Sequence, residues 1–141
     1  MRRLVTGLDD GGRPCVLEDV EVSFVEVMPG VGLHVAFETP ENPLPARPPG
    51  RGDLLPSILE PGLVRWNIVE YEPSLEIPLH HTDTVDFDPV LWGSAELILD
   101  DGAHQLGPGD CVVVTGVDHA WRAGPAGCQL SVTTLGTPPL S

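Results

Sequence analysis

The sequence predicts an all-β protein, built as a sandwich or a barrel of short strands. Its 141 residues contain 16 glycines and 16 prolines, which interrupt nearly every apolar run. The runs between them are short and rich in β-branched residues, and a helical period is hard to find anywhere. Many short strands joined by Gly/Pro turns are typical of sandwiches and barrels.

Ten runs have the composition of strands, and turn sequences such as Pro-Gly, Asp-Asp-Gly and Gly-Pro-Gly-Asp separate most of them. In chain order they are Cys15–Leu17, Val20–Val27, Leu33–Glu38, Leu63–Glu70, Leu75–Leu79, Thr84–Trp92, Ala95–Leu99, His104–Leu106, Cys111–Thr115 and Cys128–Leu135. No internal repeat and no second domain is visible, so residues 1–141 are expected to form one domain.

Residues 39–62 stand apart because they contain seven prolines. Proline lacks the N–H that a strand ladder requires, so this region cannot form a central strand. We expect a long loop that crosses the barrel or lies against a partner subunit, with a short helical turn at Ser57–Glu60. A loop of this length is uncommon unless it is functional or mobile.

The charge composition excludes several classes of function. Twenty-one acidic residues face seven arginines and no lysine, which gives a net charge of −14 and disfavours binding to nucleic acid. No run approaches the roughly 20 apolar residues that cross a membrane, and no apolar segment follows Arg2 and Arg3 as in a secretory signal. A cytoplasmic protein without membrane association is therefore expected.

Candidate chemistry is concentrated in residues 78–121. Side chains alternate between the two faces of a strand, so His80, Thr82, Thr84 and Asp86 are expected to share one face. Such a polar set is costly to bury unless each group finds a partner, and a bound metal is one such partner. Downstream, the apolar run Cys111–Thr115 ends at a glycine turn, and antiparallel pairing would bring the following His119 beside this strand.

This segment resembles the cupin superfamily. Asp86 lies seven positions before Gly93, which is similar to the carboxylate position of the first cupin motif. The second motif is matched by its spacing, since Gly102 is six positions before Pro108 and Gly116 is three positions before His119. The sequence is most similar to small single-domain cupins with a His-x-Thr-Asp-Thr-x-Asp core and a His-Ala-Trp ending. The resemblance implies a double-stranded β-helix, or jelly-roll barrel, that forms a homodimer.

The chain departs from the cupin pattern at the second histidine of the first motif, where it has Thr82. His81 could replace it only through a bulge that turns its ring inward. The remaining set, His80, Asp86 and His119, suits a divalent metal such as iron, manganese, nickel or zinc, with open positions for substrate. The alternative is a hydrogen-bonded polar interior without metal, in which Asp86 acts as general acid or base.

Three further residues are predicted to shape a pocket: Thr82, Trp121 and Arg65. The resemblance implies an enzyme in which Asp86 and His119 are catalytic. Its substrate would be an organic acid, ketone or polyketide-like molecule, and its reaction a decarboxylation, isomerisation, dehydration, cyclisation or oxygenation. The alternative is a non-catalytic cupin that binds a small-molecule metabolite as a sensor or carrier.

Overall fold

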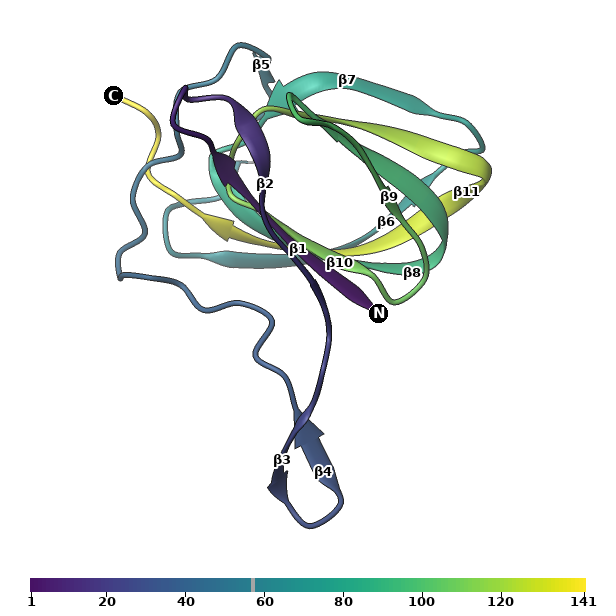
Figure 1. Ribbon diagram of the computed structural model, residues 1–141. Helices are drawn as coiled ribbons and strands as arrows, with labels where there is room; N and C mark the ends of the chain where they lie inside the picture. The colour runs from purple at the N-terminus through teal and green to yellow at the C-terminus, as the bar shows by residue number, and fades with distance from the viewer. Residues whose placement is uncertain (57) are drawn as a thin grey trace.

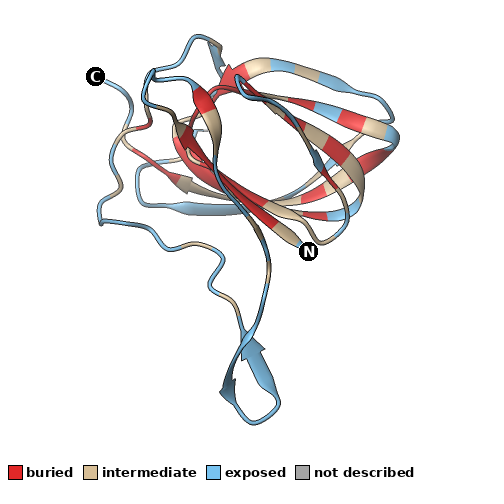
Figure 2. Ribbon diagram, in the orientation of Figure 1, coloured by how far each residue is buried: buried red, intermediate tan, exposed pale blue. Residues whose placement is uncertain are grey.

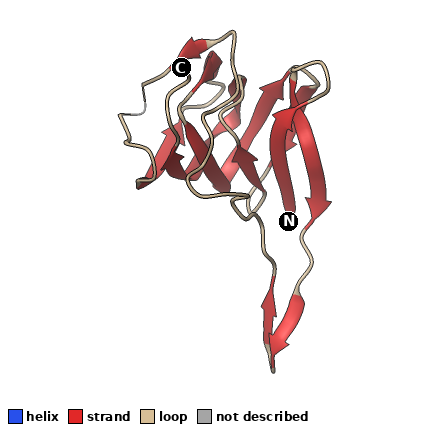
Figure 3. Cartoon of the chain, turned by 90° about the vertical axis from the view of Figure 1, so that its left-hand side faces the viewer, coloured by secondary structure: helices blue, strands red, loops and turns tan. Residues whose placement is uncertain are grey.

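The computed structural model describes residues 1–56 and 58–141, and these ranges form strands and no helix (Figure 3). The strands are β1 (Arg2–Leu8), β2 (Pro14–Glu21), β3 (Val25–Met28), β4 (Val31–Leu33), β5 (Asp53–Leu54), β6 (Val64–Tyr71), β7 (Glu76–His81), β8 (Thr84–Leu99), β9 (Gly102–Leu106), β10 (Cys111–Val114) and β11 (His119–Gly136). The described residues contain no helix long and apolar enough to cross a membrane.

One nine-stranded sheet curls on itself to enclose the core (Figure 1). Its order is β2-β1-β10-β8-β11-β7-β5, with β6 joined to β11 and β9 joined to β8. The long strands β8 and β11 pair antiparallel, with register shifts between Ala123 and Cys128 and between Gln129 and Leu130. Bulges bend and twist a strand, so each of these two long strands can follow the curvature of the sheet. The predicted all-β jelly-roll class is confirmed.

The strand boundaries differ from prediction in several places. β1 was not among the predicted strands, because Arg2 and Arg3 conceal its apolar character; they form ion pairs with carboxylates of β2. The two runs predicted on either side of Gly93 are one strand, β8, because this glycine takes a positive φ of 72° within it. The predicted strand Leu33–Glu38 does not form, and Leu33 is instead the last residue of β4.

Burial is concentrated inside the curl and on one patch of its outer face (Figure 2). The interior cluster comprises Leu4, Val90, Ala95, Leu97, Leu99, Leu106, Val112, Val114, Val117, Trp121, Cys128 and Leu130. A smaller cluster on the outer face contains Val5, Val85 and Val113, covered by Phe37 and Leu44 from the loop region. The interior cluster therefore surrounds any site built inside the barrel.

Within the described residues of the Pro-rich region, 39–56 and 58–62, the structure has one short strand. Asp53 and Leu54 form β5, which pairs in parallel with the last residues of β7. Residue 57, where the expected helical turn would begin, lies outside the described residues. The parallel pairing places the loop directly beside His80.

The strands β3 and β4 form a separate two-stranded hairpin, which we call the arm. It projects away from the barrel (Figures 1 and 3) and is joined by strand pairing to no other element. Every residue of β3 and β4 is exposed (Figure 2).

Candidate functional site

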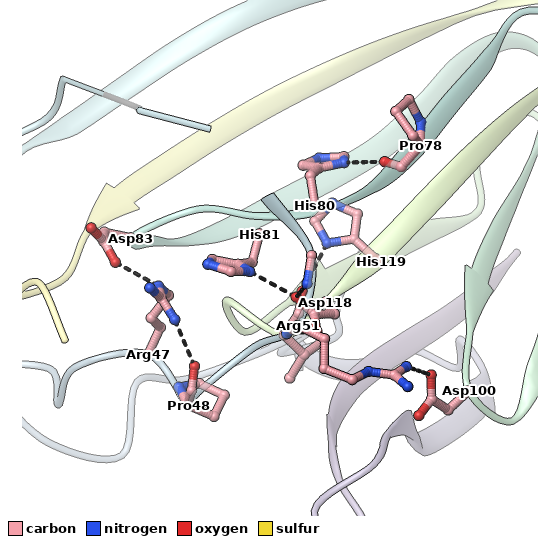
Figure 4. Close-up of polar contacts among 12 residues, drawn as sticks. Arg47, Pro48, Arg51, Pro78, His80, His81, Asp83, Asp100, Asp118 and His119 are labelled. Carbon is pink, nitrogen blue, oxygen red and sulfur yellow. Dashed lines mark hydrogen bonds and ion pairs between the residues drawn. The ribbon is translucent and has the colours of Figure 1, made fainter. Parts of the chain in front are cut away.

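Two histidines from distant parts of the chain meet at the end of the barrel. His80 ends β7 and His119 begins β11, and the two residues are direct partners in the antiparallel pairing of these strands. Their ring centroids are 4.3 Å apart. Both residues are buried, with His80 8% and His119 3% exposed. Figure 4 shows the two rings close together. The predicted juxtaposition of these two imidazoles is therefore present.

The backbone fixes the proton on each ring. The Nδ1 of His80 lies 2.9 Å from the carbonyl oxygen of Pro78, and the Nδ1 of His119 lies 2.9 Å from that of Val117. A carbonyl can only accept, so each Nδ1 carries the hydrogen in the neutral ring. The Nε2 atom of each ring is then the one with a free lone pair. Histidines that bind a metal or accept a proton are commonly oriented in this way.

Burial keeps His119 neutral. Removal from water lowers the pKa of His119 to about 4, and the neighbouring His80 ring also disfavours a second charge. At pH 7 the His119 ring is thus an acceptor rather than a cation.

A second polar group lies on the inward face of β8. Asp86 and Asp88 pair with Val114 and Val112 of β10, which belong to the interior cluster. The hydroxyl of Thr84 donates to Asp86. Burial raises the pKa of Asp86 to about 6, although this hydrogen bond opposes the shift. Asp86 is therefore able to exchange a proton near neutral pH.

Asp88 is buried more deeply than Asp86. Burial, and after it the charge of Asp86, raises its pKa well above the usual value of a carboxyl group. Its Oδ1 has no hydrogen-bond partner among the described residues. Burial, followed by the charge of Asp88, also raises the pKa of Tyr71. Asp88 and Tyr71 were not predicted from the sequence, although Asp88 continues the alternation of Thr84 and Asp86 along one strand face.

The ring of Trp121 lies near those of His119 and Tyr71. Its ring centroid is 6.3 Å from that of His119 and 6.4 Å from that of Tyr71. It also lines a surface hollow of about 340 Å³ at the β7–β11 end of the barrel. The other lining residues of the hollow are Glu76, Ile77, Pro78, Ile98, Ala120 and Arg122. The placement of Trp121 fits a wall between the surface and the interior.

The proposed metal ligands are not gathered into one cluster. The groups that influence the charge of His119 are His80, His81 and Asp118, whereas Asp86 interacts with Thr84 and influences Tyr71. Within residues 1–56 and 58–141, no three His, Cys, Asp or Glu side chains are arranged to hold a metal ion. The residues present thus offer two imidazoles, and the described geometry does not fit the three-ligand site.

The remaining predicted pocket residues have separate positions. Thr82 lies 2.7 Å from Thr84 through their hydroxyl oxygens and so extends the chain of hydrogen bonds that ends at Asp86. Arg65 is exposed on β6, where it donates to the carbonyl oxygen of Ile58.

The ring of His81 is turned toward Asp118 (Figure 4). Its Nδ1 donates to Asp118 Oδ1 over 2.7 Å, and the backbone N–H groups of Arg51 and Gly52 donate to the same carboxylate. Burial alone would raise the pKa of Asp118, but these hydrogen bonds hold it below its usual value. Asp118 therefore fastens the Pro-rich loop beside His119.

Sequence comparison finds similarity to fungal proteins. No family model matches the sequence. Phomopsin biosynthesis cluster protein D of Diaporthe leptostromiformis is 31% identical over 100 residues, which are 64% of this chain and 52% of that protein. Oryzines biosynthesis cluster protein J of Aspergillus oryzae is 38% identical over 68 residues, which are 48% of this chain and 38% of that protein. The chain thus spans about half the length, or less, of these curated relatives.

Similar solved structures include two enzymes. The polyketide cyclase RemF of Streptomyces resistomycificus has a TM-score of 0.47 and 27% identity, over 50% of this chain and 53% of that one. A sugar phosphate isomerase of the cupin superfamily from Silicibacter pomeroyi has a TM-score of 0.45 and 25% identity, over 53% of this chain and 52% of that one.

Proposed function

We propose that this chain, which has the curled all-β sheet and the motif spacing of a small cupin, is an enzyme that modifies a small organic molecule inside its barrel. The observation that carries the proposal is the buried pair His80 and His119, with the Nδ1 of each ring held by a backbone carbonyl. Orienting two buried imidazoles in this way leaves two acceptor nitrogens shielded from bulk water, an arrangement suited to holding a substrate hydroxyl or enol.

The chemistry we propose is proton transfer on an organic acid, ketone or polyketide-like substrate. Asp86, whose pKa is raised to about 6, would give and take the proton because this value lies near the working pH. The neutral Nε2 of His119 would accept a hydrogen bond from the substrate and orient it. Isomerisation, dehydration and cyclisation each need such a proton exchange.

A role in natural-product tailoring is supported by the similarity to the phomopsin and oryzines biosynthesis cluster proteins. The similarity covers 64% and 48% of this chain respectively. Trp121 supports an aromatic or conjugated substrate, because its ring centroid lies 6.3 Å from that of His119.

A divalent metal remains a prediction from the sequence resemblance and is not used in this chemistry. The two imidazoles suit iron, manganese, nickel or zinc, but Asp86 belongs to a different group of side chains. The proposed proton transfer is therefore assigned to the chain's own residues.

The test is an untargeted conversion assay on pooled organic acids, ketones and aromatic polyketides, followed by mass spectrometry. The protein is compared with His119→Asn and with the matched control His104→Asn, whose ring pairs with Asp101 outside the buried group. We expect at least one compound to be converted to an isomer or to a product lacking water, by the parent and the control but not by His119→Asn. If the parent binds a compound and never converts it, the chain is instead a non-catalytic binding protein.

A further inference from the structure

A hollow of about 260 Å³ lies where the Pro-rich loop and the segment before it meet the barrel. Val85 of β8 and Val117, in the segment before β11, line it from the barrel, and Phe37 and Leu44 line it from the other side. We call it the loop hollow. The paired histidines and the carboxyl groups of β8 are not among the described residues that line it. The loop hollow is therefore separate from the site described above.

Apolar groups form most of the loop hollow. Apart from Arg47, Thr115 and Thr137, the described residues that line it are glycine, proline, aliphatic or aromatic. The charge of Arg47 is neutralised, because its Nε donates to Asp83 over 2.7 Å and its side chain is only 8% exposed (Figure 4). The hydroxyl of Thr115 donates to the carbonyl of Thr6. Both of these polar groups thus have partners within the chain.

Thr137 differs from them because its hydroxyl is unpaired. The residue is 3% exposed, and its Oγ1 has no hydrogen-bond partner among residues 1–56 and 58–141. Its backbone N–H donates to the carbonyl of Asp83 over 3.0 Å, which holds the residue beside the Arg47–Asp83 ion pair. A buried hydroxyl without a partner is unfavourable. A molecule in the loop hollow that reaches Thr137 supplies the missing partner.

Several contacts fix the loop side of the hollow. Phe37 packs on Phe87 of β8 with ring centroids 5.8 Å apart. The Nη1 of Arg47 donates to the carbonyl of Pro48 over 3.0 Å, in addition to the ion pair with Asp83 (Figure 4). Prolines form part of the lining, and their fixed φ limits the conformations of the loop. A site held in this way loses little conformational freedom on binding, which favours affinity.

The size and charge of the loop hollow define the ligand. An apolar protein cavity of about 150 Å³ binds benzene, so a hollow of about 260 Å³ takes roughly ten non-hydrogen atoms. A charged ligand is disfavoured, because the one charged residue among the described lining residues is already paired and transfer of a charge from water is costly. One polar group is accommodated, at Thr137.

We propose that the loop hollow is a second binding site, which takes a small uncharged molecule of roughly ten non-hydrogen atoms bearing one hydroxyl or carbonyl group. The apolar body of the ligand packs on Val85, Val117 and Leu44. Its polar group bonds to the hydroxyl of Thr137, which can donate to a carbonyl or accept from a hydroxyl. This site goes beyond the proposed proton transfer and does not depend on it.

Naphthol, naphthalene and naphthoate test the proposal, because they share one apolar body and carry a hydroxyl, no polar group and a carboxylate respectively. Their binding to the nitrogen-15-labelled chain is followed by NMR titration. Naphthol should bind, with the largest shifts at the amides of Val85, Thr115 and Val117, and naphthoate should bind at least about ten times more weakly. No binding of naphthol, shifts centred on His80 and His119, or equal affinity for naphthoate would overturn the proposal.

Thr137→Val tests the polar contact. The variant replaces the hydroxyl with a methyl group of similar size, so naphthol should bind about five to ten times more weakly while naphthalene binds unchanged. Loss of an unpaired buried hydroxyl should also raise the melting temperature. The matched control is Thr115→Val, which removes the lining hydroxyl that already has a partner and should keep the parental ratio of the two affinities. Equal effects of Thr137→Val on both ligands would contradict the proposed hydrogen bond.

Ala46→Phe tests the location of the site. Ala46 lines the loop hollow and is half-buried, so a phenyl ring at this position fills part of the space. Neither naphthol nor naphthalene should then bind detectably. The control Ala126→Phe, at an exposed position outside the lining, should bind naphthol as the parent does. So should His80→Asn, because the site is independent of the paired histidines. Unchanged binding in Ala46→Phe, or lost binding in His80→Asn, would overturn the proposal.

Discussion

His80 and His119 face each other across the pairing of β7 and β11, with ring centroids 4.3 Å apart. Thirty-nine positions separate them in the sequence, yet each ring donates its Nδ1–H to the carbonyl two residues before it. The equivalent local hydrogen bonds give the two rings the same protonation pattern. Both rings therefore present Nε2 as the acceptor nitrogen.

The paired imidazoles are expected to bind Ni²⁺ independently of Asp86. Nickel should raise the melting temperature of the parent by several degrees, because a ligand at 100 times its dissociation constant stabilises by about 2.7 kcal/mol. The rise should disappear in His80→Asn and His119→Asn and persist in Asp86→Asn. Differential scanning calorimetry with and without Ni²⁺ measures it. Loss of the rise in Asp86→Asn would favour the three-ligand site predicted from the sequence.

Asp88→Asn is expected to change the pH dependence of stability. Because burial raises the pKa of Asp88, the folded chain keeps a proton that the unfolded chain has already released. The parent therefore loses stability as the pH rises from the ordinary carboxyl value toward the raised one, at up to about 1.4 kcal/mol per pH unit. Asparagine cannot ionise and avoids this loss.

Urea unfolding of both proteins between pH 4 and pH 8 measures the effect of Asp88→Asn. The variant should gain stability relative to the parent as the pH rises. Parallel stability curves would mean that Asp88 has an ordinary pKa in the folded chain.

Gly50→Ala is expected to release the Pro-rich loop from the barrel. A methyl group at this position would overlap the carboxylate of Asp118 and the ring of His81. The loss of their shared contact should destabilise the protein by about 1–3 kcal/mol. The backbone N–H groups of Arg51 and Gly52, which donate to Asp118, should then exchange with deuterium faster.

The matched control for Gly50→Ala is Gly107→Ala, where the added methyl group meets only an ordinary contact at 3.9 Å. Hydrogen exchange in this variant should equal that of the parent. Equal exchange in both variants would show that the loop is not fastened through Asp118.

The sequence was sufficient to predict the all-β class and the meeting of His80 with His119. Both follow from the alternation of side chains along a strand and from antiparallel strand pairing, which brings residues distant in the sequence together. The direction of His81 was left open because alternation alone does not reveal a partner such as Asp118, which lies 37 positions away. The hydrogen bond to this carboxylate determines which way the His81 ring points.

The grouping of the carboxylates could not be predicted in the same way. Asp86 was assigned to the histidines because the cupin spacing places a carboxylate there, but its side chain contacts Thr84 on its own strand. Aspartate is one methylene shorter than the glutamate of that motif, which limits its reach. The separate β3–β4 arm was also missed, since an exposed run of valines has the same pattern as a core strand.

The most direct test of the central claim is the protonation state of the two rings, measured by nitrogen-15 NMR of histidine-labelled protein at pH 7. His80→Asn and His119→Asn assign the signals. Both rings should be neutral, with the hydrogen on Nδ1 and a free lone pair on Nε2. A hydrogen on Nε2 of either ring, or a doubly protonated His119, would contradict the proposed acceptor site.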